Sequence, residues 1–188
     1  MADSLRGQYL IAGKWLRDEN FFKTVVLLVE HGSGGAMGLV VNRPSSITVA
    51  AALAQHFNIP DSDDVVYLGG PVETDSLFVL HDVNSFEFDE APVIPGLYVG
   101  SSEKVFENVV SSVCNGNEGL NYRIYSGCAG WAPGQLESEV DRGDWYVYPA
   151  TADLVFDENP YEVWDALLAK VKKSTQILPD VPGDPSLN

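Results

Sequence analysis

The apolar residues of this chain fall mostly in short runs, separated by turns rich in glycine, proline and aspartate. Runs rich in β-branched and aromatic residues predict β-strands, because these side chains pack well on a pleated surface. The expected strands are Tyr9–Ala12, Thr24–His31, Gly38–Asn42, Val65–Leu68, Leu77–His81, Leu97–Val99, Tyr122–Tyr125, Trp145–Tyr148 and Leu154–Phe156. Phe86 and Phe88 alternate with acidic residues, which indicates a further short edge strand.

Apolar residues three and four positions apart predict helices in four places. We expect them over Ile47–Phe57 after an N-cap at Ser46, from Ser101 or Ser102 to Cys114, over Gly134–Arg142 with Pro133 in the first turn, and from Pro160 to about Ser174. The last helix has the clearest start, because Asn159 is a good N-cap and proline is favoured at the first helical position. Three lysines near its end suit the helix dipole.

A length of 188 residues is enough for one sizeable hydrophobic core, and no proline-, glycine- or serine-rich linker divides the chain. We therefore expect residues 1–188 to form one domain, with residues 175–188 as an extended tail that prolines and glycine punctuate. The expected helices occur irregularly rather than after every strand. This order favours the α+β class over a doubly wound sheet.

The glycine-rich segment at residues 32–38 resembles a phosphate-binding loop. A dinucleotide site needs a helix after such a turn, because free amide groups at the helix N-terminus bind the pyrophosphate. Here the following residues, Gly38–Asn42, have a strand pattern, and Met37 occupies the position of the third glycine. The segment therefore predicts a β-hairpin whose glycines adopt positive φ angles, and no cofactor is expected.

Acidic residues dominate the charge: 27 Asp and Glu against 11 Lys and Arg give a net charge of −16 and a pI near 4.3. Such a surface repels nucleic-acid phosphates and anionic lipids, so neither nucleic acid nor membrane is an expected partner. The sequence shows no leader pattern and no apolar run long enough to span a bilayer. We expect a cytoplasmic protein in which Cys114 and Cys128 are free thiols.

Three side chains are candidates for catalysis or metal binding. His31 and His81 end expected strands, and Cys128 lies near an expected helix N-terminus, where a thiol becomes more reactive. No two histidines have the helical spacing of a metal site, and no G-x-S-x-G elbow is present. No metal is therefore expected, and structural roles are favoured. A site that the fold assembles from these three residues stays open as an alternative.

The most distinctive stretch runs from Gly130 to Glu139. Gln135, Glu139 and Arg142 are three and four residues apart, so one helical face would present an amide, a carboxylate and a guanidinium beside Trp131. This arrangement indicates a polar binding site. The alternative is an exposed helix face held by salt bridges, with the tryptophan buried beneath it.

Taken together, several segments resemble the AlgH/YqgE family of bacterial proteins. The matching segments are Gly7–Ala12, Glu30–His31, Gly35–Gly38, Asn42–Pro44, Gly69–Val72, Leu80–His81, Gly130–Glu139, Trp145 and Asp184–Asn188. The resemblance implies an α+β fold with a branched or partly barrel-like mixed sheet surrounded by helices. In some members the family name denotes a transcriptional regulator of exopolysaccharide genes, and no enzymatic activity is established for the family as a whole. Cys128 departs from the family pattern, in which an aromatic residue usually precedes Ala-Gly-Trp.

The preferred interpretation is a non-enzymatic protein that acts through a protein partner or a small ligand. The candidate binding surface comprises His31, Asn42, Gly69, Gly70, Pro71, His81, Trp131, Gln135 and Glu139. A transcriptional regulator that contacts DNA directly is one alternative, although the expected helices are separated by strands and the basic cluster lies only near Lys170. An enzyme that uses His31, His81 or Cys128 is the other.

Overall fold

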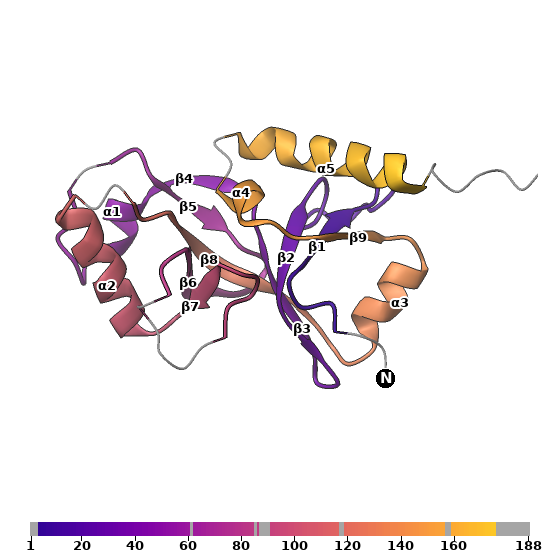
Figure 1. Ribbon diagram of the computed structural model, residues 1–188, viewed down its shortest axis with the longest axis horizontal. Helices are drawn as coiled ribbons and strands as arrows, with labels where there is room; N and C mark the ends of the chain where they lie inside the picture. Colours follow the sequence, from indigo (N-terminus) through magenta and orange to yellow (C-terminus); the bar gives the residue numbers. More distant parts are fainter. Residues whose placement is uncertain are drawn as a thin grey trace, which may run out of the picture.

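The fold is given by a computed structural model, which describes residues 4–60, 62–84, 86, 91–116, 119–156 and 159–175 (Figure 1). Its strands are β1 Gln8–Ala12, β2 Val25–Gly32, β3 Gly35–Val40, β4 Pro44–Thr48, β5 Val65–Leu68, β6 Val72–His81, β7 Tyr98–Gly100, β8 Tyr122–Trp131 and β9 Trp145–Pro149. Its helices are α1 Val49–Leu53, α2 Glu103–Cys114, α3 Gln135–Asp141, α4 Ala152–Val155 and α5 Pro160–Thr175. None of these helices is long and apolar enough to cross a bilayer.

The strands of the described residues join in one branched sheet. Along its main path the order is β4-β5-β8-β3-β2-β1-β9, and β6, which pairs with β7, also pairs with β8. Strand β8 is the branch point, because its Tyr125 and Ser126 pair with both β5 and β6, whereas Ala129–Trp131 pair with β3. The β5–β8 pairing is parallel and the other pairings are antiparallel. The α+β class and the branched mixed sheet are confirmed.

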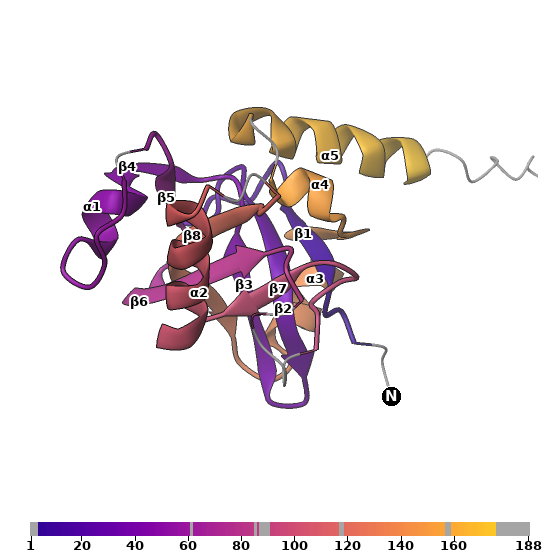
Figure 2. The same cartoon turned by 60° about the vertical axis from the view of Figure 1, so that its left-hand side comes forward.

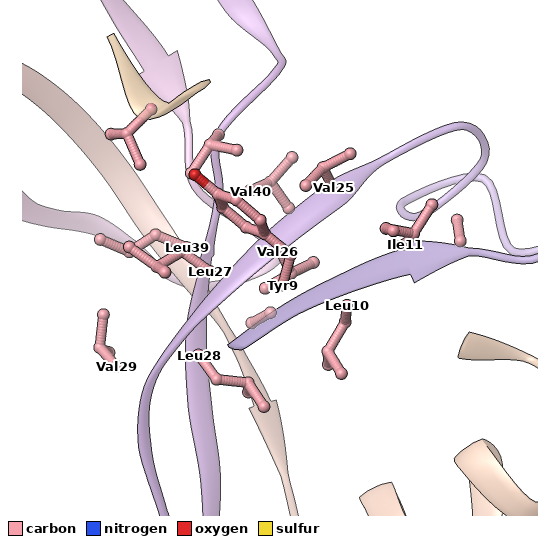
Figure 3. Close-up of a cluster of buried hydrophobic side chains, with 14 of the residues drawn as sticks. Tyr9, Leu10, Ile11, Val25, Val26, Leu27, Leu28, Val29, Leu39 and Val40 are labelled. Carbon is pink, nitrogen blue, oxygen red and sulfur yellow. The ribbon is translucent and has the colours of Figure 1, made fainter. Parts of the chain in front are cut away.

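The larger hydrophobic core forms where β1, β2 and β3 meet helix α5. The run Val25–Val29 is buried at every position, which is typical of a strand that is covered on both faces. Figure 3 shows its side chains packed with those of β1 and β3. Helix α5 crosses the sheet above β1 and β2 (Figure 1), and the indole Nε1 of Trp164 donates a hydrogen bond of 2.8 Å to the Ala12 carbonyl.

A second hydrophobic cluster joins helices α1 and α2 to β5, β6 and β8. Val105, Phe106 and Val109 of α2 are buried against these strands, whereas α1 lies further out at the same end of the molecule (Figure 2). The side chain of Ser102 accepts a hydrogen bond from the Val105 amide, so the expected N-cap of α2 is confirmed.

The prediction of a helix over Ile47–Phe57 is largely wrong. Residues Pro44–Thr48 form strand β4 instead, and α1 covers only Val49–Leu53. The N-cap is Thr48 rather than Ser46, because the Thr48 hydroxyl accepts from the Ala51 amide at 3.2 Å. Pairing with β5 outweighs the helical spacing of the apolar residues.

Other expectations also differ from the structure, and strand β6 begins at Val72 instead of Leu77. Strand β8 continues to Trp131 instead of ending at Tyr125, and the expected strand Leu154–Phe156 lies in helix α4 and the turn after it. The N-cap of α3 is Gly134, so Pro133 precedes the helix. The expected edge strand around Phe88 and the expected tail beyond Thr175 lie outside the described residues.

The glycine-rich segment is a β-hairpin, as expected. Strand β3 begins at Gly35 directly after the turn, so no helix N-terminus faces an anion there. Of the four glycines only Gly35 has a positive φ, of 117°, and a Cβ at that position would lie 2.3 Å from the Trp131 carbonyl oxygen. Gly38 instead allows close packing, since a Cβ there would lie 2.5 Å from a methyl group of Val26.

Candidate functional site

The fold divides the nine candidate residues among three places. The first, between β6, β7 and the segment before β7, contains His81. The second, around helix α3, contains His31, Trp131, Gln135 and Glu139. The third, where the chain after β5 crosses β8 and β3, contains Asn42, Gly69, Gly70 and Pro71.

Around α3, Glu139 is the centre of a hydrogen-bonded aromatic cluster. One of its carboxylate oxygens accepts from the indole Nε1 groups of Trp131 at 2.8 Å and Trp145 at 2.9 Å. The other accepts from the Gln135 amide at 2.9 Å, so these two side chains lie on one helical face, whereas Arg142, expected beside them, pairs with Asp144. The ring of Phe21 stacks on Trp131. The carboxylate thus binds groups of its own chain and ties α3 to β8 and β9.

Both ring nitrogens of His31 also form hydrogen bonds within the chain. Its Nδ1 accepts from the Leu5 amide at 3.0 Å, so in the neutral ring Nε2 carries the proton and donates to Glu137 at 3.1 Å. These bonds join the N-terminal segment to β2 and α3. His81 is buried between the rings of Tyr98 and Phe86.

His31, His81 and Cys128 do not converge on one site. His81 pairs with Tyr122 at the start of β8, and Cys128 lies six residues further along the same strand, roughly 20 Å away. Cys128 is inside β8 rather than at a helix N-terminus, and burial, together with the charge of Glu73, raises the pKa of its thiol. In the part of the chain that the structure describes, no three His, Cys, Asp or Glu side chains form a metal-binding group.

The two thiols should therefore differ in reactivity. Cys114 is exposed at the end of α2, and Cys128 is buried with a raised pKa, so we expect Cys128 to react at least about tenfold more slowly with an aromatic disulfide reagent. Stopped-flow labelling of the native protein measures both rates, and a Cys114→Ser variant isolates the slow one. Equal rates would contradict the burial of Cys128.

Where the chain after β5 crosses β8 and β3, glycines allow the two stretches of backbone to pack directly against each other. The amide of Gly69 donates to the Ser126 carbonyl, and its own carbonyl accepts from the Val40 amide, both at 2.8 Å. A Cβ on Gly70, whose φ is 152°, would lie 2.3 Å from the carbonyl carbon of Cys128. The side chain of Asn42 accepts from the Val25 amide and donates to the Lys23 carbonyl. Glycine and asparagine are therefore needed here for the fold itself.

Beside this crossing lies a groove of about 230 Å³, here called the Arg43 groove. It is lined by Asn20, Val40, Arg43, Leu68, Gly70, Pro71, Thr74 and Ser126. Two large apolar side chains are exposed here: Leu68, which lines the groove, is 48% exposed, and Val72 next to it is 43% exposed. The groove thus combines an apolar wall with one cation.

Arg43 is held in place by backbone carbonyls. Its guanidinium donates to the carbonyls of Asn20, Glu19 and Phe22, which accounts for three of its five N–H groups. Partial burial lowers the pKa of Arg43, and Asp18 opposes this shift. Among the described residues, the other two N–H groups have no hydrogen-bond acceptor. Arg43 is therefore fixed in position and still able to donate to a ligand.

Sequence reasoning missed Arg43 and Leu68 as site residues. Arg43 lies inside the Asn42–Pro44 segment, and Leu68 directly precedes the Gly69–Val72 segment. These two family-like segments were the sequence signal that could have indicated both residues. A larger hollow, of about 540 Å³, is lined by residues between 48 and 59 alone and includes no candidate residue. Another hollow, of about 410 Å³, is lined by His31, Gly35 and Trp131, but the ring N–H groups of His31 and Trp131 are already hydrogen-bonded within the chain. We prefer the Arg43 groove because two separate motifs meet there around a guanidinium with N–H groups left to donate.

Comparisons with known proteins give the family. The model of the AlgH-like family, DUF179, matches residues 9–176. The chain belongs to this family. It is 38% identical over 162 residues to a UPF0301 protein of Myxococcus xanthus, covering 85% of this chain and 86% of that protein. It is 33% identical to a UPF0301 protein of Chlorobium chlorochromatii, covering 97% and 94% of the two chains.

Solved structures agree with the AlgH-like fold. The solution structure of the AlgH protein from Pseudomonas aeruginosa matches with a TM-score of 0.71 at 34% identity and covers 96% of each chain. A crystal structure of a Corynebacterium diphtheriae protein matches with a TM-score of 0.71 at 24% identity, covering 90% of this chain and 88% of that one. The second likeness supports the fold alone.

Proposed function

We propose that this AlgH-like protein is a non-enzymatic binding protein that acts through a protein partner. The partner inserts an apolar side chain into the Arg43 groove, and the free N–H groups of Arg43 donate to a carbonyl or carboxylate of the same partner segment. The observation that carries this proposal is the meeting of the Asn42–Pro44 and Gly69–Val72 segments around an apolar hollow with a fixed guanidinium.

The size of the groove favours a protein segment over a metabolite. Pockets for small molecules usually enclose about 300–1,000 Å³, whereas about 230 Å³ is enough for one or two side chains. Exposed apolar residues beside a hollow are typical of protein interfaces, and Leu68 and Val72 supply them here. A small ligand remains the alternative within this proposal.

The candidate residues around α3 fit a role in stabilising the fold better than a role in contacting the partner. The polar groups of Trp131 and Glu139 are already hydrogen-bonded to each other. Direct DNA binding is the weaker form of a regulatory role, because α2 and α3 are separated by β8 and the net charge is −16. Regulation through a protein partner avoids both difficulties.

Leu68→Asp tests the groove. The side chain is half exposed, so the fold should tolerate the change, while a charge in the apolar wall should weaken partner binding at least about tenfold. Partners are captured from native lysate by a photo-crosslinking residue at Pro71, identified by mass spectrometry, and titrated as purified proteins. Ile47→Asp is the control, since Ile47 is similarly exposed but does not line the groove.

The outcomes separate the groove from other surfaces. A partner that binds wild type and Ile47→Asp equally but loses affinity for Leu68→Asp supports the proposal. Equal binding by both variants would remove the groove as the site. A metabolite that raises the melting temperature of wild type but not of Leu68→Asp would replace the protein partner with a small ligand.

A further inference from the structure

A hollow of ligand size lies between the two arms of the branched sheet. One arm is β3 with β2, the other is β6 with β7, and both arms pair with β8 (Figure 2). The hollow, here called the Arg6 pocket, has a volume of about 380 Å³ and is lined by residues of both arms. This volume lies within the range of about 300–1,000 Å³ that is usual for small-molecule sites.

The floor of the Arg6 pocket is apolar. Val29 of β2 and Met37 of β3 line it from one arm, and Phe78 of β6 and Val99 of β7 line it from the other. Val99 pairs with Leu80, which is two residues from Phe78, so Val99 and Phe78 share one face of their arm. Met37, Phe78 and Val99 are only partly buried. They therefore leave apolar surface that a ligand side chain can cover.

A β-bulge shapes one edge of the pocket. The register between β2 and β3 shifts between Leu28 and Glu30, so Val29 is an extra residue without a partner on β3. The Val29 carbonyl instead accepts a hydrogen bond of 2.9 Å from Nε of Arg6. Bulges are over-represented next to active sites, where they redirect side chains. Here the bulge fixes a guanidinium at the edge of the pocket.

Arg6 is held rigidly and keeps donors for a ligand. Besides the bond to Val29, its two terminal nitrogens donate to the carbonyls of Pro92 at 2.8 Å and Ala91 at 3.0 Å. These bonds account for three of the five N–H groups of a guanidinium. Within the described residues the other two, one on each terminal nitrogen, have no acceptor. Arg6 can therefore donate to a carboxylate in the pocket without moving.

Glu30 supplies a negative charge on the same edge. It pairs directly with Met37, so the two side chains lie on the same face of their arm, and Glu30 also lines the pocket. Arg6 is bonded to the residue directly before Glu30, yet the two side chains form no ion pair within 4.0 Å. The pocket thus presents one positive and one negative charge, close together but unpaired, beside an apolar floor.

We propose that the Arg6 pocket binds a free α-amino acid with a large apolar side chain. The carboxylate of the ligand accepts from the two remaining N–H groups of Arg6, and its ammonium group donates to Glu30. Its side chain covers Met37, Phe78 and Val99.

The two charges select this class of ligand. A fatty acid would satisfy Arg6 but bring its carboxylate beside Glu30, and an apolar amine would meet Arg6 in the same unfavourable way. Only a zwitterion satisfies both groups. The proposal does not depend on the Arg43 groove, because the Arg6 pocket shares no lining residue with it.

The first test compares four ligands by isothermal titration calorimetry on the full chain. L-Phenylalanine should bind saturably, with a Kd of about 1 mM or lower. Phenylalaninamide lacks the carboxylate, N-acetyl-L-phenylalanine lacks the ammonium group, and glycine lacks the apolar side chain. Each should bind at least about fivefold more weakly than L-phenylalanine, because each loses one of the three proposed contacts.

The second test pairs each variant with the ligand group that it should recognise. Glu30→Gln should bind L-phenylalanine at least about fivefold more weakly, with no change for N-acetyl-L-phenylalanine. Arg6→Gln should weaken L-phenylalanine equally and leave phenylalaninamide unchanged. A variant that keeps its affinity for the analogue is still folded. Glu107→Gln is the matched control, because Glu107 is exposed on α2, lies outside the pocket lining and gives the same change in charge.

Three results would overturn the proposal: no saturable binding of L-phenylalanine, L-methionine or L-leucine, equal affinity for L-phenylalanine and its N-acetyl derivative, or equal loss in Glu30→Gln and Glu107→Gln. Leu68→Asp should bind L-phenylalanine as wild type does, and Glu30→Gln should keep its affinity for a partner of the Arg43 groove. Failure at one site would therefore be distinguishable from failure at the other.

Discussion

Replacing Gly70 with alanine is expected to lower the free energy of unfolding by about 4 kcal/mol. The added Cβ would lie 2.3 Å from both the carbonyl carbon and the carbonyl oxygen of Cys128. Backbone atoms of a central strand cannot move aside as a flexible side chain can, and a φ of 152° is itself unfavourable for alanine. Urea unfolding monitored by tryptophan fluorescence measures the loss, which corresponds to a melting temperature about 10 °C lower.

Gly34→Ala is the matched control for that substitution. Gly34 has no atom within 4 Å of the position that a Cβ would occupy, and its φ is not positive. We therefore expect a change within about 1 kcal/mol, in either direction. If Gly70→Ala were as harmless as Gly34→Ala, the close crossing of the chain after β5 over β8 would be wrong.

Glu139→Ala is expected to cost about 3 kcal/mol of unfolding free energy. The substitution leaves the buried indole N–H groups of Trp131 and Trp145 without their acceptor, and each unsatisfied buried donor is costly. The near-ultraviolet circular dichroism of the tryptophans should change as well. Chemical unfolding and that spectrum are the two measurements.

Two further variants on α3 test whether the loss of stability in Glu139→Ala comes from the indole hydrogen bonds. Glu139→Gln keeps one carbonyl oxygen as an acceptor, so it should lose about half as much stability as Glu139→Ala. Asp141→Ala changes an exposed carboxylate on the same helix and should stay within about 0.5 kcal/mol of wild type. An equal loss in all three variants would point to helix propensity or net charge instead of the indole contacts.

Local patterns in the sequence predicted much of the fold. The hairpin at residues 25–40, the capped helix α2 and the start of α5 at Pro160 each depend on residues that are close in sequence. Predictions failed where a distant strand decides the outcome. Helical spacing was expected from Ile47 onward, but Pro44–Thr48 is a strand because β5 pairs with it. The strand expected to end at Tyr125 continues to Trp131, because β3 pairs with its last residues.

The candidate site was predicted only in part. The spacing of Gln135 and Glu139 correctly indicated that their side chains meet, and Trp131 is buried, as in the alternative considered for that stretch. Arg142 instead pairs with Asp144. No pattern in the sequence indicated that Glu139 accepts from two tryptophans, because Trp145 reaches it only once β9 has joined the sheet.

The sequence by itself determined the strands and helices with strong local signals, the absence of a nucleotide-binding glycine loop, the acidity and the family resemblance. These depend on side-chain type and short spacings, which any fold must accommodate. The tertiary structure alone decided that Asn42–Pro44 meets Gly69–Val72 around Arg43, and that Trp164 of α5 donates to the Ala12 carbonyl of β1. Such contacts join residues many positions apart, and their geometry is set by strand pairing and core packing rather than by local preference.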